Sequence, residues 1–260
     1  MKTVILAGGL GTRLAERTHE LPKPMVEIGG RPILWHVMKV YERAGFEDFC
    51  VALGYRGEAI KSYFLNYYTL SRDLSVNLSD GAIDRHKVNS ETWNVHLIDT
   101  GQKTNTGGRI RRLQEWIGNE RFMLTYGDGV CDIDVRDVIA THERTKALVT
   151  ILAVRPPARF GGLVCNENQV VEFTEKPQIG EGWINGGFMV CEPGIFDYLS
   201  SDEDSLEKDA LEAIAADGKL AAHFHEDFWQ CMDTLRELRL LQELWDSGNP
   251  PWLRKLEKSA

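Results

Sequence analysis

Short apolar runs alternate with amphipathic segments from the first residues of the chain onward, and this rhythm restricts the possible folds more than any other feature. The runs with the length and composition of buried strands are Thr3–Ala7, Phe49–Leu53, Val95–Ile98, Phe122–Tyr126 and Leu148–Val154. Strands that alternate with helices at this pitch favour a parallel sheet covered on both faces. We therefore predict an α/β fold: a Rossmann-like mixed, mostly parallel sheet flanked by helices.

The segments between these runs carry apolar residues at helical spacing. From Pro32 to Tyr41 the spacing predicts a helix, and Gly45 is a plausible stop. The further predicted helices are Glu58–Tyr68, Arg109–Ile117 and Val135–Thr145. Near the C-terminal end, Thr234 and Glu237 have the spacing of a capping box, which predicts a helix that continues to Trp245.

Two regions interrupt the alternation. Leu74–Ser79 and Ile83–Val88 flank Asp80-Gly81, a dipeptide suited to a tight hairpin turn. This insertion, about residues 70–92, has too few neighbours of its own to bury both faces, so we expect it to pack on another subunit or to form an exposed flap. The pattern of Val164–Val190 instead predicts two or three strands joined by polar loops. Because no linker or repeat divides the chain, we expect one domain over residues 1–260.

The overall charge restricts the partners. The 260 residues carry a net charge of −9, and an acidic body is repelled by nucleic acids and by anionic membranes, so we expect neither as a partner. The longest apolar runs, such as Ala147–Val154, are far shorter than the roughly 20 residues needed to span a bilayer. The N-terminal segment also lacks the features of a signal peptide. We expect a cytoplasmic protein.

The cysteines and histidines give no metal signal by their spacing. The five cysteines are Cys50, Cys131, Cys165, Cys191 and Cys231. They are scattered and include no CxxC pair, so neither a zinc site nor a disulfide framework is indicated, and we expect small core residues. His223 and His225 share one face of a strand, but without a third ligand nearby we favour packing or surface positions for them.

A glycine-rich segment directly after the first predicted strand is the strongest chemical signal. It runs Leu6-Ala7-Gly8-Gly9-Leu10-Gly11-Thr12-Arg13-Leu14. Glycines let the main chain approach a polyphosphate closely, and their N–H groups can form an anion-binding nest. Arg13 adds a guanidinium fork for phosphate oxygens. A purely structural turn needs one or two glycines, whereas three followed by arginine favour a phosphate site.

Two familiar phosphate motifs do not fit this segment. The dinucleotide-binding fingerprint requires a third glycine after Gly9-Leu10-Gly11, and that glycine is missing. A Walker A pattern requires Gly-Lys-Ser/Thr, which the sequence does not contain. A nicotinamide-dependent dehydrogenase is therefore disfavoured.

Lys23 lies between two prolines, about ten residues after the glycines. Proline restricts both its own backbone and that of its predecessor, so the lysine should be held on a stiff extended segment. A fixed ammonium beside a phosphate loop is suited to neutralising charge at a phosphorus under attack. We predict Arg13 and Lys23 as the catalytic cations.

Two aspartates are the candidate metal ligands. Asp128, in Tyr126-Gly127-Asp128-Gly129, follows a predicted strand, and ligands bind at the carboxyl ends of strands in open α/β sheets. A carboxylate flanked by glycines can reach Mg²⁺, although an ordinary Asp-Gly turn is the alternative. Asp233 directly precedes the predicted C-terminal helix, and because Thr234 fits the capping role, Asp233 is a candidate for the second ligand.

Two later segments suit a second substrate. Lys176, in Glu175-Lys176-Pro177, is fixed by the following proline and can hold a phosphate, and Asn185-Gly186-Gly187 can supply amide groups for sugar hydroxyls. Surface loops are the alternative for each of these segments. Arg109 belongs to a group of arginines on a solvated helix face, but its place near a helix start would let it reach a phosphate.

Together these segments resemble the sugar-phosphate nucleotidyltransferases. The segments that carry the resemblance are Leu6–Leu14, Pro22–Pro24, Gly127–Gly129 and Glu175–Pro177, with matching spacing over nearly the whole chain. Those that resemble the branch of glucose-1-phosphate cytidylyltransferases are Pro24–Gly30, Pro32–His36, Trp93–Val95, Thr106–Arg109, Thr125–Val130, and Trp229–Gln230 with Met232–Thr234. The resemblance implies that CTP and α-D-glucose 1-phosphate react, with Mg²⁺, to give CDP-glucose and pyrophosphate. It also implies a role in lipopolysaccharide O-antigen biosynthesis.

The resemblance further implies roles for individual residues. The nucleotide pocket would comprise Leu6, Ala7, Gly8, Gly9, Leu10, Gly11, Thr12, Arg13, Lys23, Thr104, Arg109 and Gly127. Mg²⁺ would be held by Asp128 and Asp233. The sugar phosphate would be bound by Glu175, Lys176, Asn185 and Gly186, within a sugar-binding part of about residues 155–232. Similar enzymes are homo-oligomers, often hexamers.

The residues alone leave two alternatives to the hypothesis of a cytidylyltransferase. The same reaction with UTP or dTTP fits every segment described above, because the preference for cytosine comes from the resemblance alone. A non-catalytic sugar-nucleotide-binding protein is the remoter alternative. It would be attractive only if the arginine, the lysine or the two carboxylates were absent from the sequence.

Overall fold

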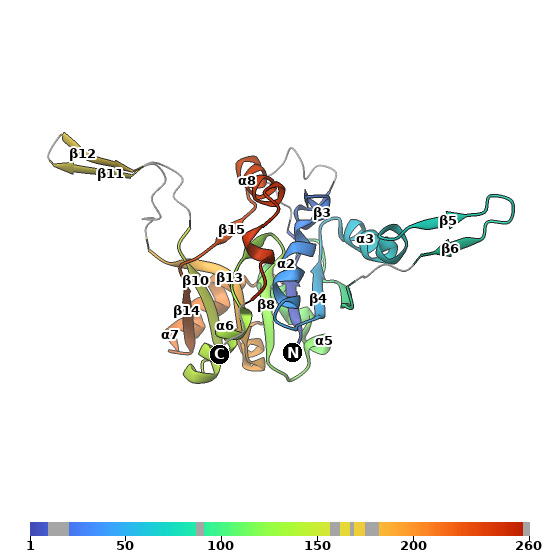
Figure 1. Cartoon of the computed structure of the whole chain (residues 1–260). Helices are drawn as coiled ribbons and strands as arrows, with labels where there is room; N and C mark the ends of the chain where they lie inside the picture. The colour runs from blue at the N-terminus through green and yellow to red at the C-terminus, as the bar shows by residue number, and fades with distance from the viewer. Residues whose placement is uncertain (10–20, 87–90, 157–161, 167–168, 175–181, 257–260) are drawn as a thin grey trace.

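A computed structural model describes residues 1–9, 21–86, 91–156, 162–166, 169–174 and 182–256, with side chains omitted between 157 and 181. Its centre is a seven-stranded sheet in the order β14-β10-β13-β8-β1-β4-β7 (Figure 1). The strands are β1 (Thr3–Leu6), β4 (Asp48–Leu53), β7 (Asn94–Asp99), β8 (Phe122–Tyr126), β10 (Val149–Val154), β13 (Ile184–Cys191) and β14 (Leu220–His225).

The sheet is mixed and mostly parallel, which confirms the predicted fold class. The strands β7, β4, β1 and β8 run parallel to one another, as do β10 and β14. Strand β13 is antiparallel to both of its neighbours, β8 and β10. The carboxyl ends of β1, β7 and β8 therefore reach the same edge of the sheet.

Helices and short strands surround this sheet. The helices are α2 (Ile33–Glu42), α3 (Gly57–Leu70), α4 (Thr106–Arg112), α5 (Gln114–Ile117), α6 (Val135–Thr145), α7 (Glu212–Ala216), α8 (Leu235–Asp246), the 3₁₀ turns η2 (Lys23–Met25), η3 (Pro193–Tyr198) and η5 (Pro251–Leu253), and the π-helix η4 (Leu206–Leu211). The short strands form four pairs: β2 (Glu27–Ile28) with β3 (Arg31–Pro32), β5 (Leu74–Val76) with β6 (Ile83–Arg85), β9 (Gly129–Cys131) with β15 (Trp229–Cys231), and β11 (Gly162–Asn166) with β12 (Gln169–Thr174). Among the described residues, no helix is both long and apolar enough to cross a membrane.

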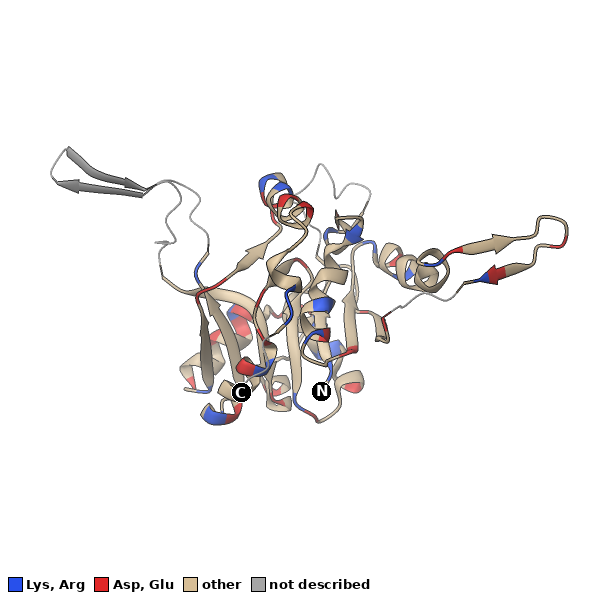
Figure 2. Cartoon of the chain, viewed as in Figure 1, with Lys and Arg blue, Asp and Glu red and all other residues tan. Residues whose placement is uncertain are grey.

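The core has two layers, one on each face of the sheet. On β1, Ile5 packs in one apolar cluster with α2, whereas Val4 and Leu6 pack in the other, with α4 and η3. This division follows from the two-residue repeat of a strand, in which successive side chains point to opposite faces. The central strands carry few charged residues, which lie mainly on the surrounding helices and loops (Figure 2).

One predicted helix begins earlier than its sequence pattern indicated. The structure replaces the helix at 109–117 with α4 and α5, and α4 is capped by the Asn105 side chain. Gly107 and Gly108 concealed this start, because glycine disfavours helices. Both positions require glycine, since a Cβ on Gly108 would lie 2.5 Å from the carbonyl oxygen of Asp202, and one on Gly107 2.7 Å from that of Asp204.

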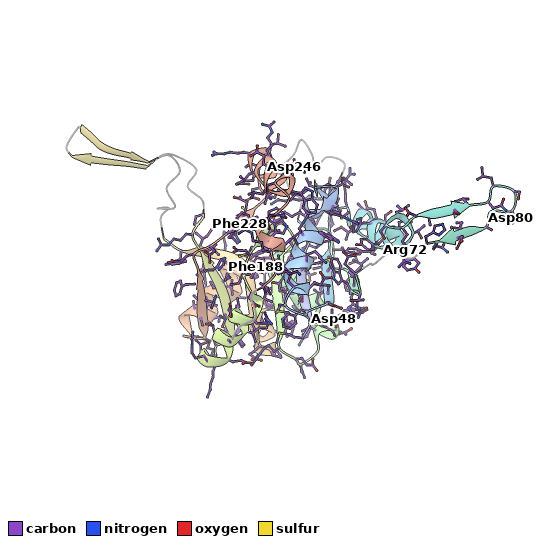
Figure 3. All side chains as sticks on the ribbon, viewed as in Figure 1. Asp48, Arg72, Asp80, Phe188, Phe228 and Asp246 are labelled. Atoms are coloured by element: carbon purple, nitrogen blue, oxygen red, sulfur yellow. The ribbon has the colours of Figure 1, made fainter. Side chains whose placement is uncertain are left out.

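The predicted hairpin is present, but its turn is wider than the two-residue turn expected. The backbone of Asn77 pairs with that of Ala82 and leaves four residues in the loop, where Gly81 has a φ of +74°. The hairpin projects from the body beyond α3, with Asp80 in its loop and Arg72 near its base (Figure 3). Leu78 is 92% exposed, so within this chain the hairpin is an exposed flap.

The other elements follow the sequence closely. The segment 164–190 contributes three strands, β11, β12 and β13. The capping box is confirmed, because Thr234 and Glu237 exchange the expected hydrogen bonds at the start of α8. Thr234 thus caps the helix, and the Asp233 side chain is turned elsewhere.

A buried histidine on α2 should make stability depend on pH. His36 is fully buried, its Nε2 donates to the carbonyl of Ile28 at 2.9 Å, and its Nδ1 accepts from the Trp252 indole at 3.2 Å. Burial lowers the pKa of His36 to about 4. The unfolded chain therefore takes up a proton that the folded chain excludes as pH falls through 6.5, and stability is lost there.

We expect His36→Gln to weaken this pH dependence, because a glutamine amide can make both hydrogen bonds but does not titrate. Between pH 7.5 and pH 5 the wild-type free energy of unfolding should fall by about 2 kcal/mol more than that of the variant. Urea unfolding at the two pH values measures the difference. Equal losses in the two proteins would show that His36 has no role in the pH dependence.

Candidate active site

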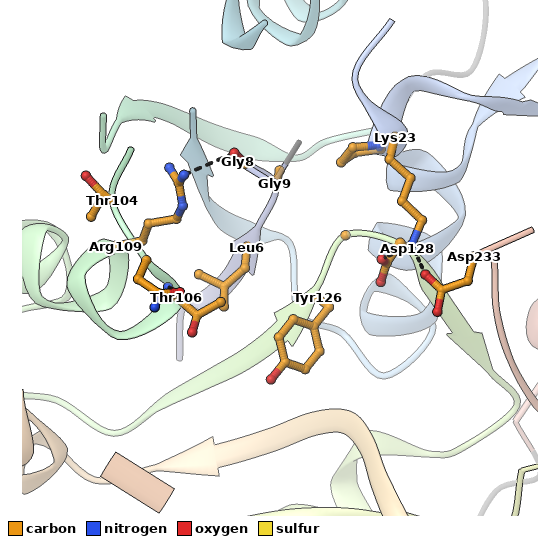
Figure 4. Close-up of a pocket in the computed structure, with 14 residues that line it drawn as sticks. Leu6, Gly8, Gly9, Lys23, Thr104, Thr106, Arg109, Tyr126, Asp128 and Asp233 are labelled. Carbon is orange, nitrogen blue, oxygen red and sulfur yellow. Dashed lines mark hydrogen bonds and ion pairs between the residues drawn. The ribbon is translucent and has the colours of Figure 1, made fainter. Parts of the chain in front are cut away.

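The carboxyl edge of the sheet opens into a cavity of about 380 Å³ (Figure 4). It is lined by the turn after β1, the start of η2, the loop after β7 with the first part of α4, the segment after β8, and Asp233 after β15. Its walls are Leu6, Ala7, Gly8, Gly9, Lys23, Pro24, Thr104, Asn105, Thr106, Arg109, Tyr126, Gly127, Asp128 and Asp233. Every described residue that the sequence suggested for the nucleotide or the metal therefore borders one space.

Lys23 joins the two candidate metal ligands. Its ammonium nitrogen lies 2.5 Å from Oδ2 of Asp128 and 2.5 Å from Oδ1 of Asp233. Asp128 lies between β8 and β9, Asp233 follows β15 after one intervening residue, and the pairing of β9 with β15 brings the two together. Burial lowers the pKa of Lys23, but attraction to both carboxylates outweighs this and holds the pKa above its ordinary value. Lys23 is therefore a permanent cation here.

The same arrangement tests whether a divalent metal suits the site. The two carboxylate oxygens already converge on one positive group, which acts as a stand-in cation between them. The cluster carries one positive and two negative charges. Mg²⁺ takes few protein oxygens and completes its shell with water and phosphate, so Asp128 and Asp233 are a suitable ligand pair.

Arg109 has a different environment from the solvated face that the sequence suggested. Its guanidinium is buried and donates to the carbonyls of Leu53 at 3.0 Å, Gly101 at 2.8 Å and Gly8 at 3.0 Å, and to the Thr100 hydroxyl at 2.9 Å. Figure 4 shows it pointing toward the turn after β1. Arg109 thus borders the cavity while it ties three loops together.

Two glycines make room for this guanidinium. A Cβ on Gly8 would lie 2.3 Å from Nη1 of Arg109, and one on Gly54 would lie 2.4 Å from the same atom. Separations below 3.0 Å do not occur for real Cβ atoms. Gly8 therefore has a steric reason to be glycine, in addition to any close approach of a phosphate.

A second cavity, of about 280 Å³, adjoins the first. It is lined by Thr125, Tyr126, Asp128, Gly129, Asn185, Gly186, Gly187, Trp229, Cys231 and Asp233. Asp128 and Asp233 belong to both cavities, so the carboxylate pair stands at their junction. The Trp229 indole donates to the carbonyl of Gly186 at 2.8 Å, which fixes one wall. Asn185 and Gly186, which the sequence suggested for a sugar, both line this cavity.

Tyr126 also lines both cavities, and its side chain had no role in the predictions from the sequence. Its hydroxyl donates to Glu207 at 2.5 Å, and Glu207 also accepts from Thr106 and Ser205 at 2.8 Å each. Glu207 lies on the π-helix η4, an element often found at functional sites. These bonds hold the phenol ring in one position.

Six of the sequence-based candidates lie outside the described residues. They are Leu10, Gly11, Thr12, Arg13, Glu175 and Lys176. Among the described residues, the structure therefore brings together the two candidate metal ligands, Asp128 and Asp233, with Lys23 and with the glycines that begin the turn after β1. The sequence assigned no role to the side chains of Tyr126, Trp229 and Cys231, which line these cavities. Tyr126 and Trp229 belong to segments that carry the family resemblance, but only the strands they border show where their side chains lie.

Comparison with known proteins places these features in a family. The sequence profile described as nucleotidyl transferase matches residues 2–246. The glucose-1-phosphate cytidylyltransferase of Salmonella typhimurium is 46% identical over 253 residues, which is 97% of this chain and 98% of that protein. A probable glucose-1-phosphate cytidylyltransferase of Bacillus subtilis is 40% identical over 253 residues, 97% and 99% of the two chains.

A solved structure supports the fold independently. The crystal structure of HddC from Yersinia pseudotuberculosis superimposes with a TM-score of 0.69 at 25% identity, and the match covers 94% of this chain and 99% of that one. The sheet and its surrounding helices are thus shared at low sequence identity.

Arg109→Lys should destabilise the fold, because one ammonium cannot serve the four acceptors that the guanidinium reaches, and buried carbonyls would lose their partners. We expect a loss of about 2–4 kcal/mol in the free energy of unfolding, measured with urea. Arg111→Lys, on the exposed side of the same helix, is the matched control and should change it by less than about 0.5 kcal/mol. Equal effects of the two substitutions would contradict the structural role of Arg109.

Proposed function

Because this chain belongs to the nucleotidyl transferase family, we propose that it transfers a cytidylyl group from CTP to α-D-glucose 1-phosphate, giving CDP-glucose and pyrophosphate. The observation that carries this proposal is the convergence of Lys23, Asp128, Asp233 and the glycine turn on one cavity. The Salmonella and Bacillus proteins are 46% and 40% identical to this chain over 97% of its length, and this similarity supports CTP and glucose 1-phosphate as the substrates.

The first cavity binds the nucleotide. The turn at Gly8 and Gly9 presents main-chain groups to the phosphates, and Arg13, which follows in sequence, adds a guanidinium. Thr104 and Gly127 complete the pocket, and Arg109 keeps the turn in place through its bond to Gly8. Leu6 and Ala7 line the cavity with apolar side chains, and Leu10, Gly11 and Thr12 are the further residues proposed to contact the nucleotide.

The second cavity binds the sugar phosphate. Asn185 and Gly186 line it and offer an amide group and a main-chain edge to sugar hydroxyls. Glu175 and Lys176 complete this subsite, where Lys176 holds the phosphate of the acceptor. The two carboxylates at the junction of the cavities then lie between the two substrates, where their phosphates meet.

The reaction is an in-line displacement at phosphorus. A phosphate oxygen of glucose 1-phosphate attacks the α-phosphorus of CTP, the bond from that phosphorus to the oxygen bridging the β-phosphorus breaks, and pyrophosphate leaves. The attacking oxygen is already ionised, so no side-chain nucleophile is needed. The chain aligns two anions and neutralises their repulsion with Lys23 and Arg13.

Asp128 and Asp233 hold Mg²⁺ in this proposal. The bound metal supplies positive charge to the phosphate oxygens. A metal held by Asp128 and Asp233 would compete with the Lys23 ammonium, which contacts both carboxylates, and the displaced ammonium would then be available to a phosphate.

Assembly and context complete the proposal. The chain works as a single catalytic domain, which the seven-stranded sheet supports because its strands come from residues 3 to 225. It acts as a homo-oligomer, for which the exposed apolar side chains of the β5–β6 hairpin offer a surface. Its product serves the synthesis of O-antigen lipopolysaccharide in the cytoplasm.

The reaction is tested by pyrophosphate release with glucose 1-phosphate and CTP, UTP, dTTP or ATP at equal concentration. We expect CTP to be preferred by at least about tenfold in kcat/KM, which corresponds to 1.4 kcal/mol of discrimination. Chelation with EDTA should abolish release, and added Mg²⁺ should restore it. Faster release with UTP or dTTP would reassign the base, and no release with any nucleotide would reject the proposed chemistry.

Removing the Lys23 charge should separate catalysis from folding. We expect Lys23→Met to lower kcat by about 100-fold or more, since an electrostatic contact in the transition state is lost, while the melting temperature changes little. Lys61→Met, on the exposed face of α3, is the control and should retain wild-type rates. Wild-type kcat in Lys23→Met would exclude the lysine from the mechanism.

The same variant tests whether the lysine occupies the metal position. Without nucleotide, Mn²⁺ should bind Lys23→Met at least about tenfold more tightly than wild type, because the competing ammonium is gone. Titration followed by electron paramagnetic resonance measures free Mn²⁺ directly, and Lys61→Met again serves as the control. Equal or weaker affinity in Lys23→Met would show that the lysine and the metal do not compete.

A further inference from the structure

A group of three potential metal ligands lies away from the carboxylate pair, at the other end of the β9–β15 ribbon. Cys131 is the last residue of β9, Asp132 follows it, and His225 is the last residue of β14. The sequence concealed this group because its histidine is separated from the other two residues by more than ninety positions. The sheet topology brings them together.

The three side chains already contact one another. His225 Nε2 lies 2.8 Å from Oδ1 of Asp132, and the Cys131 thiol shares a hydrogen bond with the same histidine. One ligand atom from each residue lies within 4.8 Å of the other two. Ligands of a tetrahedral zinc ion lie about 3.3–3.8 Å apart, so small movements of side chains would complete the geometry.

The cluster is largely buried, and it borders a cavity through which an ion could enter. Cys131 is fully buried, whereas the His225 and Asp132 side chains are 10% and 22% exposed. Beside them lies a cavity of about 270 Å³, lined by Asp132, Ile133, Asp134, Asp137, His225, Asp227 and Leu256. Its carboxylates attract cations, although Arg136 pairs with Asp134. The cavity leaves room for water as a fourth ligand.

We propose that Cys131, Asp132 and His225 form a second metal site, which takes a borderline-soft divalent cation such as Zn²⁺ rather than Mg²⁺. The ligand set of one sulfur, one nitrogen and one oxygen is of the type that zinc accepts, whereas Mg²⁺ selects oxygen. This proposal is independent of the nucleotidyl transfer proposed above.

Charge balance favours the exchange of protons for metal. Hydrogen bonding to Asp132 and Cys131 outweighs the effect of burial and raises the pKa of His225 to about 10, and burial raises that of Cys131. At neutral pH the empty cluster therefore holds an imidazolium, a thiol and a carboxylate, with no net charge. A divalent ion that replaces the proton of the thiol and that of the imidazolium leaves the net charge at zero, and two protons are released.

The bound ion would clamp β14 to the β9–β15 ribbon. That ribbon carries Asp128 just before β9 and Asp233 shortly after β15, so the clamp would brace the segments that hold the carboxylate pair. An ion that binds only the folded chain must raise its melting temperature. Occupancy at this site is thus measurable without any assay of activity.

The test uses Co²⁺ as a spectroscopic substitute for Zn²⁺, added to metal-stripped full-length protein in excess Mg²⁺. We expect a thiolate-to-cobalt charge-transfer band, intense tetrahedral d–d bands and the release of about two protons per ion in weak buffer. The Cys131→Ser and His225→Gln variants should each lose the charge-transfer band or weaken Co²⁺ binding at least about tenfold. Zn²⁺ should raise the melting temperature of the wild type but not of these variants.

Two controls separate this site from its surroundings. Cys231→Ser removes the thiol nearest Asp233, and Asp137→Asn removes a carboxylate of the cavity, so both should keep the cobalt band. A band that is lost in Cys231→Ser, or that persists in both ligand variants, would overturn the proposal. So would a wild-type titration without a charge-transfer band, a result that holds even if a variant fails to fold.

Discussion

The parallel alignment of β1, β4, β7 and β8 is the constraint on which the rest of the molecule depends. It sends the ends of these strands to a single edge, where the backbone has left the hydrogen-bonded ladder and its groups can face a ligand. Lys23 and the two aspartates come from segments about a hundred positions apart, yet they meet there. Strand direction therefore places Asp128 and the turn after β1 at this edge, and the pairing of β9 with β15 adds Asp233.

The turn after β1 is held by Arg109, a buried cation whose guanidinium donates a hydrogen bond to the Gly8 carbonyl. Arg109 satisfies main-chain oxygens on three loops, and the glycines at 8 and 54 exist in part to admit it. One of these hydrogen bonds holds the Gly8 carbonyl in place. The start of this turn is thus positioned by a residue that looked, in the sequence, like part of a charged helix surface.

The sequence was a good guide wherever the signal was local. The strand at Phe122–Tyr126, the helix at Val135–Thr145 and the cap at Thr234 have the bounds that periodicity and capping predicted. Lys23 and the aspartates could be found because prolines, glycines and strand ends mark them. Tyr126, Trp229 and the environment of His225 could not, because their importance arises from pairing between distant strands. The start of α4 was not predicted, because Gly107 and Gly108 disfavour a helix.

The phenol of Tyr126 forms a partition common to both cavities, and its hydroxyl is fastened to Glu207 on the π-helix. Because the side chain of Tyr126 lines both cavities, it cannot be displaced from one cavity without changing the other. Any substitution that enlarges the cavity on one side alters the shape of the cavity on the other. With the nucleotide and the sugar phosphate assigned to these cavities as proposed, preferences for base and sugar are not independently variable at this position. Divergence of such a protein toward a new donor would then alter its tolerance for acceptors in the same step.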